Sequence, residues 1–297
     1  MGLAGLGLSA RAAATVFPGV VRAPAYFTEL WIFLGVVALG VLLPAYLLKL
    51  IRYPAAVRED FTNPATLGFC GALPVGMTLV AGGLAPYLPP VADAIWWAGA
   101  ALLVAFQVWG LCRVLAGGIE LARVNAGWMI LFIGGIVFPG AGIALGHVEA
   151  SRFLWGFSTA ITPLVMGLVF YRAAIAPPLP EALRPSWFIL LVPPSLIYAN
   201  GVALFAFDFL EILYFFGVVL AIALLVYARN FIRWPFAPSW WAFTFPLDAL
   251  AYAAARYAQS HPSMPWKLVA AATLAVATLF VVVVLWKTVR SAASRAA

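Results

Sequence analysis

Long apolar runs dominate the chain, and proline, glycine or charged residues separate one run from the next. Ten runs are present, at residues 1–14, 28–48, 65–84, 91–114, 127–145, 153–171, 186–204, 209–227, 240–258 and 266–286. A helix needs roughly 17–25 apolar residues to cross a bilayer, and all runs but the first are that long. The pattern predicts an all-α polytopic membrane protein with ten transmembrane helices, forming one transmembrane domain over residues 1–297. The short first run is consistent with a helix that begins upstream of Met1.

The odd-numbered runs from the third onward share a central proline: Pro74, Pro139, the pair Pro193 and Pro194, and Pro246. The intervals between them are 65, 55 and 52 residues, counting from Pro194 for the pair. This spacing predicts a helical hairpin repeated along the chain, with kinked odd-numbered helices, although Pro163 in the sixth run departs from the rule.

Irregular backbone survives in a membrane only where it is buried or lines a cavity. The kinked helices are therefore candidates for the wall of a pore, with the smoother even-numbered helices facing lipid. The alternative is that glycine and proline only let membrane helices pack closely. The sequence leaves both interpretations open.

Composition excludes a soluble protein. Hydrophobic residues make up 65% of the 297 residues and charged residues 9%, against roughly 45–50% and about 25% in soluble domains. The mean hydropathy of +1.04 describes the whole chain, so no extramembrane catalytic or receptor domain fits. The net charge of +7 comes from residues between the apolar runs, which indicates membrane topology rather than nucleic-acid binding.

The distribution of basic residues predicts the orientation, because Lys and Arg are retained on the cytoplasmic side. One set of loops, with the C-terminus, holds twelve of them: Lys49, Arg52, Arg58, Arg113, Arg123, Arg172, Arg184, Arg229, Arg233, Lys287, Arg290 and Arg295. The alternate loops hold five: Arg11, Arg22, Arg152, Arg256 and Lys267. With an even number of spans, both termini are expected in the cytoplasm.

Residues for catalysis or metal binding are scarce. His147 and His261 are the only histidines and lie in predicted loops, and Cys70 and Cys112 lie in apolar runs without a CxxC neighbour. The chain has no HExxH, G-x-S-x-G or P-loop motif. We therefore expect no enzyme, no cofactor and no metal.

The most informative stretch is Ser239–Pro246, SWWAFTFP, in which two phenylalanines flank Thr244 just before Pro246. With the loop Ala56–Pro64, the stretch Pro180–Pro185 and the pair Pro194–Ser195, it resembles the tellurite-resistance/dicarboxylate transporter family. That family includes the slow-type anion channels of plants and bacterial tellurite-resistance proteins such as TehA. The likeness covers about the whole chain.

The resemblance implies five helical hairpins in quasi-fivefold arrangement around a central pore, with three such protomers in a homotrimer. It also implies a multi-pass protein of the inner (plasma) membrane that passes small inorganic or carboxylate anions. The phenylalanine before the segment-nine proline plugs the pore in this family, which makes Phe245 the expected gate. The alternative is that Phe245 is one more core or lipid-facing aromatic.

The expected pore-lining residues come from the kinked helices: Gly5, Pro74, Gly76, Met77, Gly134, Gly135, Pro139, Pro194, Ser195, Tyr198, Thr244, Pro246, Asp248 and Tyr252. Hydroxyl groups there solvate a passing anion without trapping it, although they also serve as ordinary contacts between helices. Positive potential at the cytoplasmic mouth is expected from Arg58, Arg113, Arg229 and Arg233.

Asp248 is the one carboxylate well inside an apolar run, and it shares a helical stripe with Phe245, Tyr252 and Arg256. A bare carboxylate in an anion pore repels anions, so Asp248 is expected to be protonated, paired or turned away. The sequence thus favours an anion channel gated by Phe245. The alternative is a proton-coupled carrier of a C4-dicarboxylate such as malate, with Asp248 taking up the proton. Basic residues that could grip two carboxylates within the membrane are absent from the sequence, which favours the channel.

Overall fold

The computed structural model describes residues 1–17 and 25–296, which are α-helical and 3₁₀-helical without a strand in those ranges. Arg22, one of the topology residues, lies outside the described residues. The chain divides into two compact units. The first comprises Met1, Ile32–Pro178 and Ala203–Phe205, and the second comprises Gly2–Trp31, Leu179–Val202 and the chain from Ala206 onward.

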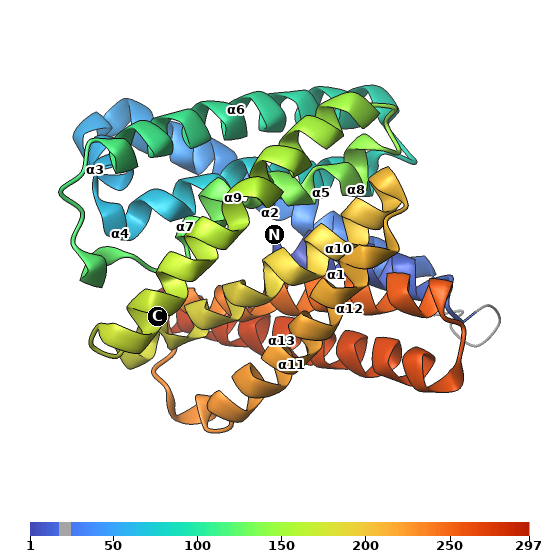
Figure 1. The fold of residues 1–297 in the computed structure, drawn as a ribbon. Helices are drawn as coiled ribbons and strands as arrows, with labels where there is room; N and C mark the ends of the chain where they lie inside the picture. Colours follow the sequence, from blue (N-terminus) through green and yellow to red (C-terminus); the bar gives the residue numbers. More distant parts are fainter. Residues whose placement is uncertain (18–24, 297) are drawn as a thin grey trace. The chain divides into compact units, whose positions relative to one another are not determined.

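The first unit holds most of α2 and the helices up to α9. Its α-helices are α2 (Ala25–Arg52), α3 (Pro54–Thr62), α4 (Pro64–Leu67), α5 (Ala72–Leu84), α6 (Pro89–Leu115), α7 (Trp128–Phe132), α8 (Pro139–Gly142) and α9 (Val148–Ile175). Three 3₁₀ segments lie among them, η1 (Gly68–Gly71), η2 (Leu121–Arg123) and η3 (Gly134–Val137). Helices α5 and α6 form a hairpin, and α9 packs on η3 and α7 (Figure 1).

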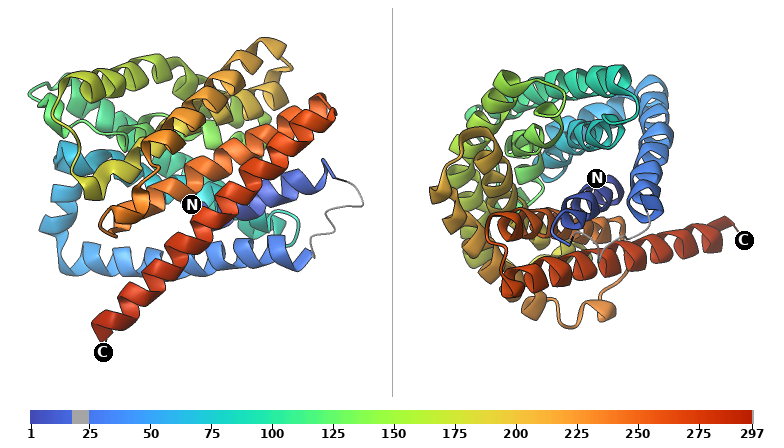
Figure 2. Two further views of the ribbon diagram at one scale, coloured as in Figure 1. Left: turned by 90° about the horizontal axis from the view of Figure 1, so that it is seen from below. Right: turned by 90° about the vertical axis from the view of Figure 1, so that its right-hand side faces the viewer.

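The second unit is built around α12. Its α-helices are α1 (Gly2–Ala14), α10 (Val192–Phe205), α11 (Glu211–Tyr227), α12 (Thr244–Ser260) and α13 (Met264–Ala296). Its 3₁₀ segments are η4 (Glu181–Leu191), η5 (Asp208–Leu210), η6 (Phe231–Arg233) and η7 (Pro238–Phe243). Helices α12 and α13 form a hairpin, and α1 packs against α12 (Figure 2).

Helical structure occupies each of the ten predicted ranges. Seven helical stretches in the described residues are long and apolar enough to cross a membrane: Tyr26–Arg52, Pro64–Leu84, Pro89–Leu115, Val148–Ile175, Glu181–Phe205, Asp208–Tyr227 and Met264–Ser294. The chain is therefore an all-helical, multi-pass membrane protein. The remaining predicted segments, 1–14, 127–145 and 240–258, contain shorter or interrupted helices, so the ten-span, five-hairpin arrangement stays a prediction.

The prolines of the odd-numbered segments mark a change of helix type. In each case a 3₁₀ segment leads into an α-helix, and the proline lies within the first three residues of that α-helix: Pro74 in α5, Pro139 in α8, Pro193 and Pro194 in α10, and Pro246 in α12. The expected mid-helix kink is thus replaced by an interruption. Proline is tolerated in a first turn because its missing N–H would have no partner within the helix there.

Burial separates the two kinds of segment. Each candidate span contains a most apolar window of 18 residues. The share of that window that is buried is 61% in Pro64–Leu84 and 83% in Glu181–Phe205. The corresponding shares in the five spans from even-numbered segments lie between 17% and 33%. The two interrupted spans are therefore more buried than the five continuous ones, and the exposed apolar side chains of the continuous helices suit contact with lipid.

Candidate functional site

The two phenylalanines that flank Thr244 have different surroundings. The Phe243 ring is fully buried and packs against five other aromatic rings, those of Phe188, Phe231, Trp234, Trp240 and Phe280. The Phe245 ring makes no such ring contact within the part of the chain that the structure describes, and Phe245 is 9% exposed. Phe243 is thus a core residue, whereas the Phe245 ring is free of the aromatic packing that would lock it in place.

The Phe245 ring lies against the backbone of α1. A Cβ atom built on Gly5 would lie 3.2 Å from Cδ2 of Phe245 and 2.8 Å from Oδ2 of Asp248. A Cβ atom on Gly2 would lie 2.0 Å from the Thr244 hydroxyl oxygen. The first helical turns of α1 therefore need glycine so that Thr244, Phe245 and Asp248 can fit, as in other small-residue contacts between membrane helices.

Hydrogen bonds also join α1 to α12. The Ser9 hydroxyl lies 2.7 Å from the Gly5 carbonyl oxygen and 2.9 Å from that of Asp248. Near the other end, the Gln259 amide donates to the Ala12 carbonyl oxygen at 3.2 Å and to the Thr15 hydroxyl at 2.6 Å. Gly2 and Ser9 were not among the predicted site residues, although the spacing of small residues at positions 2, 5 and 9 was a signal for them.

Asp248 is 1% exposed, and neither carboxylate oxygen has a hydrogen-bond partner among the described residues. Its Oδ2 atom points toward Gly5, on the same side of α12 as Phe245. Of the three expected ways to accommodate Asp248, pairing through a hydrogen bond is not found among the described residues. An unpaired buried carboxylate is costly, and inside a membrane such a group is a functional candidate.

The exposure of the side chains varies along α12. Between Thr244 and Gln259, most residues are buried, while Tyr252, Arg256 and Gln259 are partly exposed. These three positions continue the line from Phe245, and the Arg256 guanidinium donates to Gln259 at 3.1 Å. One side of α12 is thus more open than the rest of the helix.

The predicted residues of α10 pack against other helices of their unit. Pro194 and Ser195 lie against Gly217 of α11, where an added Cβ would lie 3.6 Å from Pro194 and 3.7 Å from the Ser195 hydroxyl oxygen. Tyr198 packs against Tyr214 and Tyr257, with ring centroids at 5.5 Å and 6.1 Å. These contacts join α10 to α11 and α12.

Among the predicted residues of the first unit, Gly76 has the most open surroundings. The nearest atom to a Cβ built there is a Met1 side-chain carbon at 3.9 Å. Pro74 and Met77 face α6 instead, since a Cβ on Gly99 would lie 3.2 Å from the Pro74 carbonyl oxygen and 3.2 Å from the Met77 Cβ.

The interrupted fifth segment is held by side chains that the sequence did not single out. A Cβ on Gly134 would lie 2.8 Å from Val75, and one on Gly135 would lie 2.4 Å from the Leu154 carbonyl oxygen, so both glycines allow close helix packing. The Gln107 amide donates to the carbonyl oxygens of Leu131 (3.2 Å) and Phe132 (3.1 Å), and the Ser158 hydroxyl accepts from the Gly135 N–H at 3.1 Å. These bonds satisfy the backbone groups that the interruption leaves without helical partners.

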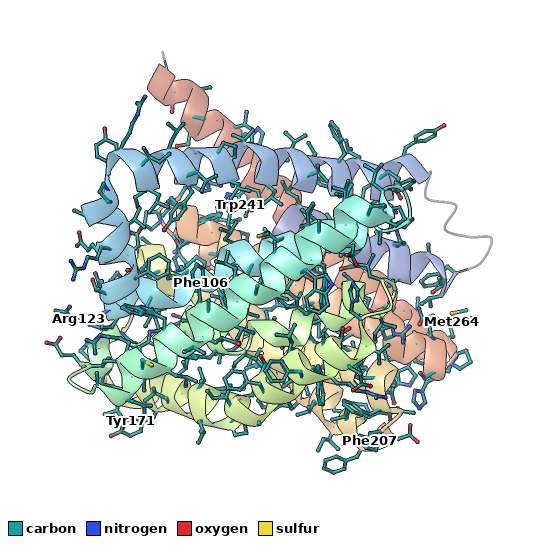
Figure 3. The ribbon with its side chains drawn as sticks, turned by 90° about the horizontal axis from the view of Figure 1, so that it is seen from above. Phe106, Arg123, Tyr171, Phe207, Trp241 and Met264 are labelled. Atoms are coloured by element: carbon teal, nitrogen blue, oxygen red, sulfur yellow. The ribbon has the colours of Figure 1, made fainter. Side chains whose placement is uncertain are left out.

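An open polar cavity of about 380 Å³ lies beside the loop Ala56–Pro64, which resembles the corresponding loop of the tellurite-resistance/dicarboxylate transporter family. It is lined by Glu59, Thr62, Asn63, Pro64, Arg113, Gly118, Glu120 and Arg123. Arg113, one of the four residues expected at the cytoplasmic mouth, thus lines a cavity, and Arg123 is labelled in Figure 3. Within residues 1–17 and 25–296, no group of three or more His, Cys, Asp or Glu side chains is arranged to hold a metal ion.

Comparison with known proteins agrees with these features. The sequence profile of the SLAC1 family, described as voltage-dependent anion channel, matches residues 1–289. The description names a class of membrane channel, and this chain has seven helical stretches among its described residues that are long and apolar enough to cross a membrane. The chain belongs to this family, which confirms the resemblance drawn from SWWAFTFP.

Named relatives include two plant proteins and one archaeal protein. The chain is 26% identical to the S-type anion channel SLAH3 of Arabidopsis thaliana over 88% of this chain and 42% of the relative. It is also 26% identical to the guard cell S-type anion channel SLAC1 of that plant, over 85% of this chain and 47% of the relative. An uncharacterized transporter of Methanocaldococcus jannaschii is 26% identical over 70% of this chain and 68% of its own length. The chain thus spans less than half the length of the plant relatives.

Proposed function

We propose that this protein is an anion channel in which the Phe245 ring closes the conduction path. The observation that carries the proposal is the position of that ring, which lies on the glycine face of α1, outside the aromatic cluster that holds Phe243. Membership of the SLAC1 family and the names of the plant relatives support anions as the conducted ions.

The proposed mechanism is steric and depends on the dryness of the path. A phenyl ring among small residues blocks a narrow path and excludes water, so ions cannot pass while it is in place. Because Phe245 has no aromatic partner among the described residues, its ring can turn without disrupting a packed cluster. Hydroxyls and backbone groups of the interrupted helices would then solvate the anion weakly enough for it to leave.

The remaining predicted lining residues belong to this proposal. They are Gly5, Pro74, Gly76, Met77, Gly134, Gly135, Pro139, Pro194, Ser195, Tyr198, Thr244, Pro246, Asp248 and Tyr252. Gly5, Gly76 and Tyr252 have the strongest support, since Gly5 contacts the gate, Gly76 has open surroundings and Tyr252 lies on the open stripe of α12.

The test is the current across a planar bilayer that holds the purified protein under a chloride gradient. We expect the Phe245→Ala variant to conduct at least tenfold more than wild type, with a reversal potential near the chloride equilibrium potential. Phe245→Tyr, which keeps the ring, serves as the matched control and should stay closed. An Ala variant that conducts no more than wild type would contradict the gate.

A substitution of Asp248 tests the channel against the proton-coupled dicarboxylate carrier. The plant relatives are named anion channels, so they support the channel. In a channel, Asp248→Asn removes a group that can only repel anions, so current through Phe245→Ala should persist or increase. In a carrier, the same variant removes the proton acceptor. Malate uptake into liposomes that needs a proton gradient and disappears in Asp248→Asn would replace the channel proposal with the carrier.

We also propose the assembly and orientation that the family resemblance and the basic residues indicate. The protein would be a homotrimer in the inner (plasma) membrane, with one pore through each protomer and both termini in the cytoplasm. Light scattering of the detergent-solubilised protein, corrected for bound detergent, tests the trimer. A monomer mass would contradict it.

A further inference from the structure

Basic and aromatic side chains gather at one end of the second unit, where Trp234 and Trp240 also pack on Phe243. We define the basic–aromatic cluster as Arg184, Arg233, Trp234, Phe236, Trp240 and Lys287. These residues come from η4, η6, η7, α13 and the short connection between η6 and η7. The channel proposal does not use them, apart from Arg233 as a source of positive potential.

Specific contacts hold these elements together. The Ser239 hydroxyl donates to the Ala182 carbonyl oxygen, which fastens η7 to η4. The Trp241 indole N–H donates to the Thr288 hydroxyl at 3.1 Å, which fastens η7 to α13 next to Lys287. The Phe231 ring packs on Trp240 with centroids 5.6 Å apart, which fixes η6. The cluster is therefore a built arrangement rather than a set of independent surface side chains.

The cations lie over aromatic faces. Lys287 Nζ is 4.9 Å from the Trp240 ring centroid and 5.9 Å from that of Phe236. Arg184 Cζ is 5.7 Å from the Trp234 ring centroid. Cation–π contacts of this kind position a cation while leaving its N–H groups available to a further acceptor.

The cluster carries an excess of positive charge. Glu181, whose Oε1 atom is 3.0 Å from Arg184, is the one carboxylate on the described parts of η4, η6, η7 and the last turns of α13. Within the described residues, no carboxylate lies within ion-pair distance of Arg233 or Lys287. Arg229 and Arg290 flank the cluster and add two further cations, and Arg233 is exposed.

The position of the cluster relative to the candidate spans places it at a membrane interface. It lies at the start of the span Glu181–Phe205, just beyond the end of Asp208–Tyr227 and near the end of Met264–Ser294. If the chain crosses the membrane once in each span, the start of the first of these spans and the ends of the other two lie on the same face of the membrane. Figure 3 shows Met264, at the opposite end of α13, well away from Trp241 of η7.

We propose that the basic–aromatic cluster binds the phosphate headgroup of an anionic phospholipid. Basic pockets between membrane helices bind anionic headgroups at the interface, and the buried Trp234 and Trp240 rings hold the cations in place there. Arginine pairs with phosphate through two parallel N–H groups, and lysine adds a point charge. The excess of basic residues on this face assigns the lipid to the cytoplasmic leaflet.

The test is native mass spectrometry of the purified full-length chain with added phosphatidylglycerol or phosphatidylcholine. We expect wild type to retain phosphatidylglycerol preferentially. Arg233→Gln, which alters an exposed side chain and leaves the packing intact, should weaken that binding about fivefold, and Lys287→Gln should do the same. Lys287→Arg should restore binding because it keeps the charge.

Lys267→Gln is the matched control, because Lys267 lies on the same helix at its other end. If it weakens phosphatidylglycerol binding as much as Lys287→Gln, or if Arg233→Gln and Lys287→Gln leave binding unchanged, the proposal is wrong. Inorganic phosphate at millimolar concentration distinguishes the source of the phosphate. Full displacement of the lipid by free phosphate would assign the cluster to a soluble anion and overturn the lipid assignment.

Discussion

Phe243 and Phe245 are separated by one residue, yet their environments differ at the scale of single side chains. Phe243 is surrounded by rings from η4, η6, η7 and α13, whereas Phe245 lies on a glycine. The sequence motif marked both residues, and the resemblance selected Phe245. The contacts with Phe188, Phe280 and Gly5, which help to separate a core ring from a candidate gate, come from segments distant in sequence, so the motif alone could not reveal them.

Phe243→Ala is predicted to destabilise the protein without opening the conduction path. Removing a fully buried aromatic ring costs about 3–5 kcal/mol, since the cavity left behind does not refill. We expect a lower midpoint of thermal unfolding in detergent and no increase in chloride current. Phe245→Ala should show the reverse pattern. If Phe243→Ala conducts as strongly as Phe245→Ala, the division of roles between the two rings is wrong.

At the scale of helices, the recurring feature is a 3₁₀ segment followed by an α-helix with proline in its first turn. The sequence located these interruptions, because proline has no N–H to donate to a carbonyl oxygen in the preceding turn of an α-helix. The side chains that satisfy the freed backbone groups, such as Gln107 and Ser158, lie on other helices and carried no local signal.

Two glycines of the inner helices are predicted to respond oppositely to a methyl group. Gly135→Ala places a Cβ 2.4 Å from the Leu154 carbonyl oxygen, a backbone atom that cannot move freely, and should cost at least about 1–3 kcal/mol. Gly76→Ala has no atom within 3.9 Å and should keep or raise the unfolding midpoint, because alanine favours helix by about 1 kcal/mol. Thermal unfolding of both variants checks this, and equal losses would contradict it.

Both histidines illustrate pairing that no sequence pattern indicated. His147 pairs with Asp93 at the start of α6, and His261 Nε2 lies 3.7 Å from Oε1 of Glu211 at the start of α11. His147 lies in the loop between the fifth and sixth predicted segments, and its partner lies in the fourth. His261 lies in the loop between the ninth and tenth, and its partner lies in the eighth. Their partners are 54 and 50 residues away in sequence, so only the packing of helices brings them together.

For the whole molecule, the basic residues make a topology prediction that labelling can check. In a background without Cys70 and Cys112, Ser294→Cys should react with a membrane-impermeant thiol reagent only from the cytoplasmic side. Ser263→Cys, between α12 and α13, should react only from the opposite side. Adding Lys287→Gln to these cysteine variants should leave the labelling pattern unchanged, which verifies that the loss of one charge leaves the topology intact. Labelling of both positions from one side would contradict the hairpin.

The sequence by itself determined the class of the protein, the location of its apolar segments and the family. These follow from composition, from the length a helix needs to cross a bilayer and from a local motif, all of which are properties of contiguous residues. Tertiary structure alone decided which ring is packed, which glycines make room for a neighbour and that Asp248 has no hydrogen-bond partner among the described residues. It also decided which distant cations share one aromatic cluster. Such features depend on contacts between helices, and these arise only when the interrupted inner helices pack.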